Sequence, residues 1–264
     1  MTSYQDAHLH LQDPRLTHDL TGIIAEVKAQ SINALVVNGT SPEDWNAVTE
    51  LSETYPQLII PSYGLHPWKT PFHLNAWKEQ LTQLINENPK ACIGECGLDK
   101  WMHNPNINAQ CDAFHFQLGL AERYNRPISI HVLKAWAPLL DSLNSHKIPQ
   151  RGFMLHGYGG SKETARQLVK LGAYFSFSGY FLQQRKQNVQ EAFRYIPLDR
   201  ILIETDAPDM CAPEQWITHP LTEKTNHPAN LVATARGLAS LLAMDFAELS
   251  NQLEANFTRF FLTE

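Results

Sequence analysis

Histidine and carboxylate side chains recur along this 264-residue chain, each close to the end of a short apolar run. His8 and His10 stand two apart in Asp6-Ala7-His8-Leu9-His10, and alternate residues of an extended segment point the same way, so both imidazoles can reach one cation. Imidazole nitrogen combined with carboxylate oxygen suits Zn, Mn, Fe or Co and, less strictly, Mg. We therefore predict a centre of one or two divalent metal ions, built from His8, His10, Glu95, His131, His156 and Asp206, with His66 as a further candidate site residue beside it.

Two carboxylates of this set are expected to take part in catalysis. A carboxylate between two metals bridges them at about 3.5–4 Å separation, and such a pair activates a water and clamps a leaving oxygen. Glu95 is placed to be that bridge. Asp206 is the natural residue to bind a metal and to take a proton from the nucleophilic water. Glu204 is expected to be a structural carboxylate that supports the site rather than a ligand.

The apolar runs predict eight strands. They are short and rich in Ile, Val, Leu and aromatic residues, which is typical of buried parallel strands. The strand candidates are Tyr4–Ala7, Ala34–Asn38, Ile59–Gly64, Cys92–Glu95, Ile128–His131, Gly152–Leu155, Tyr174–Ser178 and Ile201–Glu204. The six candidate ligands therefore end or follow the first (His8 and His10), fourth (Glu95), fifth (His131), sixth (His156) and eighth (Asp206) strands, and His66 follows the third.

Helix-length amphipathic segments separate the strands. Pro42–Thr54 has a clear start signal, with Ser41 as N-cap and Pro42 at the first helical position. The other helix candidates are Leu20–Gln30, Leu74–Asn86, Asn108–Tyr124, Ala135–His146, Lys162–Lys170, Asn188–Tyr195, Ala229–Leu242 and, after Asp245 as N-cap, Phe246–Phe261. This alternation predicts an α/β fold, and eight strands favour a closed (β/α)8 TIM barrel over an open sheet. The C-terminal strand ends of a barrel share one mouth, where active sites of the fold lie.

Residues 1–264 are expected to form a single domain, because no linker or internal repeat divides them and barrels of about 200–250 residues are routinely one domain. No Gly-x-Gly-x-x-Gly dinucleotide fingerprint follows the first strand. The formal net charge of −6 argues against a broad basic surface for long nucleic acid. The negative net charge is compatible with a metal site that binds one end of a nucleic acid strand, since bound cations supply local positive charge.

The chain is expected to be cytoplasmic and to have no membrane partner. No apolar stretch approaches the roughly 18 residues of a membrane span, and the first six residues lack the basic start and apolar run of a signal peptide. The four cysteines form no Cys-x-x-Cys pair and are expected to be reduced. The sequence leaves the oligomeric state open, and a monomer is favoured.

Taken in order, the motifs resemble those of TatD-type metal-dependent deoxyribonucleases of the amidohydrolase superfamily. They are Asp6-Ala7-His8-Leu9-His10, Gly64-Leu65-His66-Pro67, Gly94-Glu95-Cys96-Gly97-Leu98-Asp99, His131, His156-Gly157-Tyr158-Gly159-Gly160-Ser161, Glu204-Thr205-Asp206-Ala207-Pro208 and Asn226-His227-Pro228-Ala229-Asn230. The resemblance implies a TIM barrel with one or two divalent metals (Mg, Mn or Zn). It also implies hydrolysis of phosphodiester bonds in DNA, often from a 3′ strand end.

The resemblance further implies residue roles. The first metal would be held by His8, His10, Glu95 and Asp206. The second would be held by Glu95, His131 and His156. His66 would contact the scissile phosphate.

Two departures from the family pattern concern substrate binding. The usual His-x-Arg-Asp after the fifth strand reads His131-Val132-Leu133-Lys134 here, and Arg offers a bidentate fork to phosphate where Lys offers only a point charge. Lys134 either supplies this cation from a neighbouring position or is a plain surface lysine. The usual tyrosine after Gly-Leu-Asp is replaced by Lys100-Trp101, and Trp101 either stacks on a base or caps the barrel mouth.

Two other functions stay open at this point. An amidohydrolase-type enzyme acting on a small phosphoester, ester, amide or aminoacyl substrate would keep the barrel and the metals. Superfamily members that bridge metals with a carbamylated lysine carry it at strand four, where this chain has Glu95, and this favours the TatD type. A non-catalytic binding scaffold is the third hypothesis, and the complete set of ligands argues against it.

Overall fold

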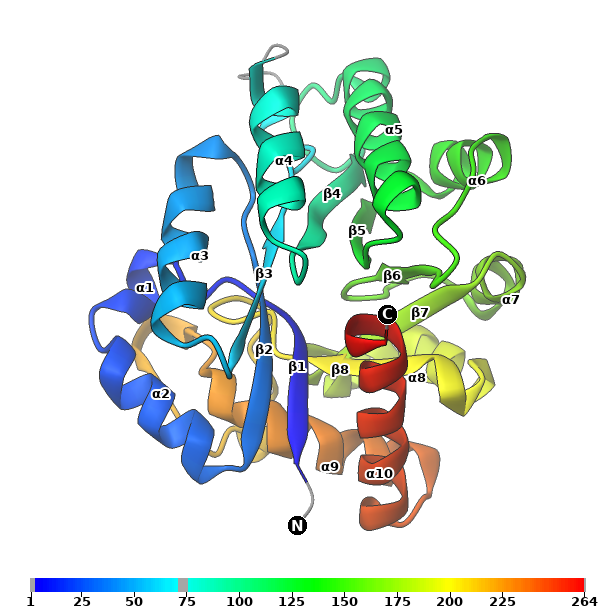
Figure 1. Ribbon diagram of the computed structural model, residues 1–264. Coiled ribbons are helices and arrows are strands. Elements are labelled where there is room, and N and C mark those ends of the chain that lie inside the picture. The colour runs from blue at the N-terminus through cyan, green and yellow to red at the C-terminus, as the bar shows by residue number, and fades with distance from the viewer. Residues whose placement is uncertain (1–2, 71–75, 264) are drawn as a thin grey trace.

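The computed structural model of the chain describes residues 3–70 and 76–263. In this part of the chain, eight parallel strands form one sheet in the order β1 to β8, each hydrogen-bonded to the next. The helices lie around the strands (Figure 1). The predicted α/β class and (β/α)8 TIM barrel are confirmed.

All eight strands lie where the apolar runs predict them. Their bounds are β1 Tyr4–Leu9, β2 Ile32–Asn38, β3 Ile59–Tyr63, β4 Cys92–Asp99, β5 Ile128–Leu133, β6 Phe153–Leu155, β7 Ala173–Ser178 and β8 Ile201–Glu204. The predicted ends of β1, β4 and β5 are wrong, because these strands continue two to four residues beyond Ala7, Glu95 and His131. Polar residues there do not stop a strand, since their side chains contact one another inside the barrel mouth.

The helices also follow the prediction, with differences at their ends. They are α1 Pro14–Thr17, α2 Leu20–Ala29, α3 Pro42–Thr54, α4 Ala76–Glu87, α5 Ile107–Tyr124, α6 Trp136–Ser145, α7 Lys162–Lys170, α8 Gln187–Tyr195, α9 Leu231–Leu242 and α10 Phe246–Phe257. The first two residues of the helix predicted from Leu74 lie outside the described residues. The one-turn α1 was not predicted, because four residues show no periodicity.

Helix caps account for two of the correctly predicted helix starts. Ser41 is the N-cap of α3 and Pro42 its first residue. Asp245 is the N-cap of α10 and accepts hydrogen bonds from the N–H groups of Ala247 and Glu248 at 2.9 and 3.0 Å. The last helix ends earlier than predicted, at Phe257, and a π-helical turn, Thr258–Leu262, continues the chain.

The ring of strands is nearly closed between β1 and the segment that follows β8. The N–H of Asp206 donates to the carbonyl of His8 at 2.9 Å, and the N–H of His10 donates to the carbonyl of Ala207 at 2.7 Å. Asp6 accepts the Thr205 N–H at 3.0 Å. These contacts fix Asp206 beside the two histidines of the first strand.

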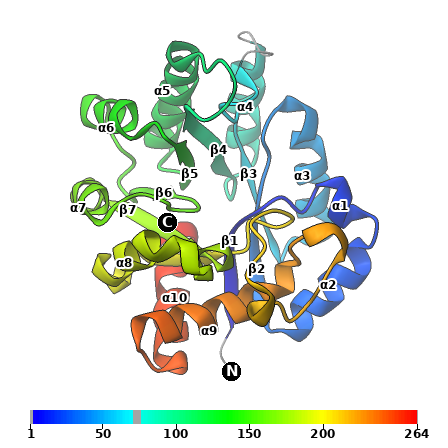
Figure 2. The ribbon, with the colours of Figure 1, turned by 180° about the vertical axis from the view of Figure 1, so that it is seen from behind.

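The C-terminal segment of the chain closes the inner core of the barrel at the N-terminal ends of the strands. Phe257, Phe260 and Phe261 pack there against Tyr174 and other inward side chains. Arg151, just before β6, donates to the carbonyl of Phe260 at 3.1 Å. In Figure 1 the red C-terminal helix α10 lies in front of the strands, with its end near β6, β7 and β8. The polar residues therefore lie toward the opposite end of the barrel, where the long connection from β8 to α9 runs beside α2 (Figure 2).

Two further predictions concern the chain as a whole. All four cysteines are free, as predicted for reduced thiols. None of the helices in the described part of the chain is long and apolar enough to span a lipid bilayer.

Candidate metal centre

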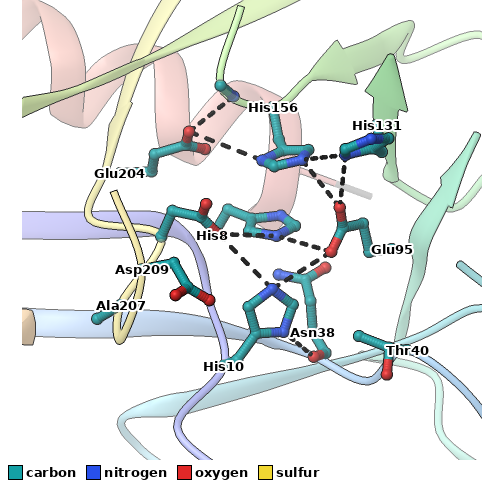
Figure 3. Close-up of polar contacts among 12 residues, drawn as sticks. His8, His10, Asn38, Thr40, Glu95, His131, His156, Glu204, Ala207 and Asp209 are labelled. Atoms are coloured by element: carbon teal, nitrogen blue, oxygen red, sulfur yellow. Dashed lines mark hydrogen bonds and ion pairs between the residues drawn. The ribbon is translucent and has the colours of Figure 1, made fainter. Parts of the chain in front are cut away.

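Five histidines converge on the carboxylate of Glu95 at the C-terminal mouth of the barrel, and Figure 3 labels four of them. His8 and His10 approach one of its oxygens, His131 and His156 approach the other, and His66 also lies near this second oxygen. Glu95 is buried, with 4% of its surface exposed. Its two oxygens thus face two separate imidazole pairs.

The first cluster consists of His8, His10, Glu95 and Asp206. Nε2 of His8 lies 3.5 Å from Glu95 Oε2 and 3.6 Å from Asp206 Oδ1. Nε2 of His10 lies 3.3 Å from the same glutamate oxygen and 3.6 Å from the same aspartate oxygen. Two nitrogens and two carboxylate oxygens therefore surround one point, which is the donor arrangement of a four-ligand cation site.

The second cluster consists of Glu95, His131 and His156. Oε1 of Glu95 lies 3.1 Å from His131 Nδ1 and 2.9 Å from His156 Nε2. These two nitrogens are 3.2 Å apart. The cluster shares Glu95 with the first, so the structure brings together all six residues that the sequence analysis selected as ligands.

The remaining nitrogens of three histidines make contacts that orient the rings. His10 Nδ1 donates to the carbonyl of Asn38 at 2.8 Å, which leaves its Nε2 unprotonated in the neutral ring. His8 Nδ1 lies 2.9 Å from Ser129 Oγ, and His131 Nε2 lies 2.9 Å from Asp99 Oδ2. Partners of this kind fix the tautomer and direction of metal-binding histidines.

One buried atom tests whether a cation fits the first cluster. Nε2 of His8 is buried and has no hydrogen-bond partner among residues 3–70 and 76–263. Burial lowers the pKa of His8 well below its usual value, so the ring is neutral and this nitrogen offers a lone pair. Because an unpaired buried polar atom is costly, the donor set fits a divalent cation.

The two carboxylates of the centre differ in proton affinity. Burial raises the pKa of Asp206 to about 7, although the neighbouring His156 and His10 oppose the shift. Burial by itself would also raise the pKa of Glu95, but His66 and His156 hold it well below its usual range. Glu95 therefore stays ionised, while Asp206 is balanced between its two protonation states near neutral pH.

His66 reaches the second cluster from the segment after β3. Its Nε2 lies 3.3 Å from Glu95 Oε1. Its Nδ1 accepts the N–H of Trp68 at 3.1 Å, so the proton of the neutral ring sits on Nε2. His66 is consequently a hydrogen-bond donor toward the centre.

Glycines allow Glu95 to sit so close to β5. Gly94 and Gly97 have φ angles of +133° and +140°, a region that favours glycine. A Cβ on Gly97 would lie 2.0 Å from the carbonyl oxygen of His131, and one on Gly94 would lie 2.7 Å from that of Ser129. The close approach of β4 to β5 brings Glu95 within reach of the His131 ring.

A cavity of about 1020 Å³ opens over the centre. Lys134 and Trp101, which together with His66 are the residues predicted to bind substrate, line this cavity and are exposed, Trp101 to 61%. Neither takes part in the two clusters. Leu133, at the position where the family has arginine, is at the cavity wall and is 36% exposed.

Glu204 supports the loop that follows β6. Its Oε1 accepts the N–H of Gly157 at 2.7 Å, and its other oxygen accepts the hydroxyl of Ser176. The closest nitrogen of His156, Nδ1, is 3.8 Å away, beyond hydrogen-bond distance. Glu204 is therefore hydrogen-bonded to neutral donors, but its carboxylate also forms a group with His8 and His156 whose ligand atoms lie within 4.8 Å of one another, so its role as a supporting carboxylate stays a prediction.

The sequence analysis assigned no role to three residues that the structure connects to the site: Asp99, Ser129 and Trp68. Asp99 stands in the quoted Gly94–Asp99 motif. Ser129 stands two residues before His131 on β5, so alternation places both side chains on the same side of the strand. Trp68 directly follows the Gly64–Pro67 motif, and nothing in its spacing indicates that it contacts Asp99.

The chain is similar to known proteins over nearly its whole length. The profile of a family described as TatD related DNase matches residues 5–262. The Bacillus subtilis protein YabD, named an uncharacterized metal-dependent hydrolase, is 30% identical over 260 residues, which cover 97% of this chain and 98% of YabD. The 3′-5′ ssDNA/RNA exonuclease TatD of Escherichia fergusonii is 27% identical over 259 residues, 97% of this chain and 98% of that protein.

The fold has a close match among solved structures. The crystal structure of YjjV, a TatD homologue from Escherichia coli, superposes on this chain with a TM-score of 0.91 at 27% identity. The match covers 99% of this chain and 98% of YjjV.

Proposed function

The chain belongs to the family of TatD related DNases, and from this premise we propose that this metal-dependent hydrolase is a nuclease that removes nucleotides from the 3′ end of single-stranded DNA. One observation carries the proposal. The two carboxylate oxygens of Glu95 face different pairs of imidazoles, one pair on each oxygen. A shared carboxylate of this kind is the bridge of a two-metal site, which suits in-line displacement at phosphorus. The relative named a 3′-5′ ssDNA/RNA exonuclease supports the choice of substrate.

We assign the first metal to the cluster of Asp206 with His8, His10 and Glu95, and the second to Glu95 with His131 and His156. Divalent ions held there would supply positive charge that acidifies a water molecule and offsets charge on the phosphate oxygens. Mg, Mn and Zn are the ions we expect, because the donors are imidazole nitrogens and carboxylate oxygens.

Asp206 is the residue we assign to accept the proton of the attacking water. Its oxygen Oδ1 stands 3.6 Å from both imidazoles of the first cluster, and burial raises the pKa of Asp206 to about 7. A general base works best when its pKa lies near the operating pH. Glu95 has the opposite property, a pKa held well below the usual range after burial and the surrounding histidines are combined, and this suits a permanent bridging anion.

His66 is assigned to the scissile phosphate. Because its Nδ1 accepts the N–H of Trp68, its Nε2–H points into the centre, 3.3 Å from Glu95 Oε1, and in the proposed complex it donates to a non-bridging phosphate oxygen. A donor directed at developing negative charge stabilises the transition state more than the ground state.

The size of the cavity favours binding of the end of a DNA strand rather than of a long stretch of nucleic acid. Its volume of about 1020 Å³ is at the upper end of pockets for small molecules. In the proposed complex, Lys134 contributes one positive charge to the backbone and Trp101 an exposed ring on which a base can stack. The net charge of −6 is compatible with this short contact.

The test is a substrate panel on protein loaded with Mg, Mn or Zn. We expect a single-stranded DNA labelled at its 5′ end to give a ladder of products shortened one nucleotide at a time, and a 3′ label to be released as a mononucleotide. RNA, a phosphomonoester, an acyl ester and an amide complete the panel. Fast turnover of an ester or amide with no cleavage of DNA would replace the nuclease by an enzyme for small substrates.

A binding scaffold without catalysis is separated from both enzymes by metal analysis. Protein that contains no divalent metal as purified, and that turns over no member of the panel after metal loading, would support the scaffold. We expect metal in the purified protein instead, because His8 Nε2 of the first cluster is buried and has no hydrogen-bond partner in the described part of the chain.

A further inference from the structure

Trp68 both lines the cavity and donates a hydrogen bond to a buried carboxylate. Among the described residues, no other tryptophan, tyrosine or phenylalanine side chain of the cavity does both. Its ring lines the cavity and is 47% exposed. Its indole Nε1–H donates to Asp99 Oδ2 at 2.7 Å. The side chain therefore touches both the space for substrate and a carboxylate that is itself fully buried.

The oxygen that Trp68 contacts is the same one that orients His131. Asp99 Oδ2 lies 2.9 Å from His131 Nε2. The other oxygen of Asp99 accepts the N–H groups of Trp101 and Met102 at 2.6 and 3.2 Å. Both oxygens of Asp99 therefore accept hydrogen bonds. Removing the indole donor of Trp68 would leave Asp99 Oδ2 with His131 as its remaining partner.

The direction of the His131 ring sets the geometry of the second cluster. With Nε2 on Asp99, the other nitrogen, Nδ1, lies 3.1 Å from Glu95 Oε1 and 3.2 Å from His156 Nε2. A partner that orients a ligand is worth about 10–100-fold in metal affinity. The contacts form one continuous chain from the cavity wall to the second cluster.

We propose that Trp68 is a positioning residue for the second metal site, acting through Asp99 and His131, and that a nucleobase of the substrate stacks on its exposed ring. Substrate binding in the cavity would thereby be coupled to the metal site. The identity of the planar group as a nucleobase rests on the proposed function, whereas the positioning of His131 does not.

The first experiment titrates metal-free protein with Mn²⁺ by calorimetry, without substrate. The variant Trp68→Phe keeps a ring but removes the indole donor, and the backbone N–H that contacts His66 is retained. We expect the Kd of the second equivalent of Mn²⁺ to rise about 10–100-fold while that of the first stays unchanged. Unchanged affinity for both equivalents would overturn the proposal.

The matched control is Trp101→Phe. Trp101 lines the same cavity and is 61% exposed, but its indole N–H has no hydrogen bond to any residue in 3–70 or 76–263. We expect wild-type affinity for both equivalents of Mn²⁺. An equal loss in the two variants would show a general effect on the cavity and would contradict the specific path through Asp99.

A double variant separates this path from a general loss of structure. If Trp68 acts through Asp99, then adding Trp68→Phe to Asp99→Asn should change the second Kd by less than about twofold, because the contact is already lost. Additive losses would mean that Trp68 acts on the site by another route, and the positioning role would be withdrawn. Near-identical melting temperatures of the single variants would show that folding is intact.

The second experiment compares Trp68→Phe with Trp68→Ala on a short single-stranded oligodeoxynucleotide. Both lack the indole donor, but only Ala lacks a ring. We expect KM to be roughly ten- to hundred-fold higher in the Ala variant than in the Phe variant, at similar kcat. Equal KM values would remove the stacking contact. If wild-type protein neither binds nor cleaves the oligonucleotide, the proposed function and the nucleobase contact fail together, and the Mn²⁺ titration still decides the positioning role.

Discussion

Asp99 and His131 form a carboxylate–imidazole pair at 2.9 Å that leaves Nδ1 of the histidine facing Glu95. The contact joins the last residue of β4 to the middle of β5, two neighbouring strands of the barrel. Since Asp99 Oδ2 takes up Nε2, only one nitrogen of His131 remains to bind a metal. The pair thus decides which atom of the ring points at the second cluster.

The first prediction removes the charge of Asp99. Asp99→Asn is expected to weaken the second metal site by about 10–100-fold, because an amide orients the His131 ring less firmly than a carboxylate does. Calorimetric titration with Mn²⁺ measures this. Asp141→Asn, on the exposed side of α6, is the control and should bind metal like wild type. A loss confined to the first equivalent of metal would contradict the assignment.

The second prediction concerns the proton acceptor. Asp206→Asn should keep the fold but lower kcat by about 10²–10⁴-fold, because the amide cannot accept a proton from water. Steady-state rates on a 5′-labelled oligonucleotide, together with circular dichroism, check it. Asp209→Asn serves as the control, since this carboxylate lines the same cavity but binds Arg15 at the rim. Near-normal rates in Asp206→Asn would remove it from catalysis.

The third prediction tests whether Glu95 is shared. Glu95→Gln should weaken both metal sites at once, because its two oxygens face different pairs of imidazoles. His10→Ala should affect mainly the first site and His156→Ala mainly the second. Metal stoichiometry by elemental analysis after gel filtration distinguishes the three variants. Retention of one full equivalent in Glu95→Gln would show that the carboxylate serves a single metal.

The fourth prediction concerns metal removal. Chelation should lower the melting temperature, because His8 Nε2 and Glu95 are buried and lose their compensating cation. A ligand at 100 times its Kd stabilises a protein by about 2.7 kcal/mol, and 1 kcal/mol corresponds to roughly 2–4 °C at this size. We therefore expect a shift of roughly 5–10 °C, reversed when metal is restored. An identical melting temperature with and without metal would exclude tight binding at these donors.

The fifth prediction addresses the junction of β1 with the segment after β8. Asp6 accepts the N–H groups of Thr205 and His8 at 3.0 and 3.2 Å and the Thr205 hydroxyl. Asp6→Ala leaves these buried donors without a partner, which costs about 1–3 kcal/mol for each. Urea unfolding should register the loss, and Asp6→Asn, which keeps an acceptor oxygen, should be much milder. Equal stability of the two variants would mean that Asp6 does not hold the junction.

The barrel could be predicted from the sequence because its evidence is local. Alternating apolar runs and amphipathic segments repeat along the chain, and caps such as Ser41 and Asp245 mark helix starts. The strand ends were less predictable. Glu95 interrupts an apolar run and so looked like an end, but β4 continues to Asp99 because inward polar side chains contact each other at the mouth.

The sequence by itself determined the candidate donors: His8, His10, Glu95, His131, His156 and Asp206 could be selected from their types and from their positions near strand ends. Only the tertiary structure decided how these donors are used. The two oxygens of Glu95 face different imidazole pairs. Trp68 and His131 contact the same oxygen of Asp99, although they are 31 and 32 positions away from Asp99 in the chain. Spacing along a chain carries no information about such contacts, because they depend on how β3, β4 and β5 are brought side by side when the barrel forms.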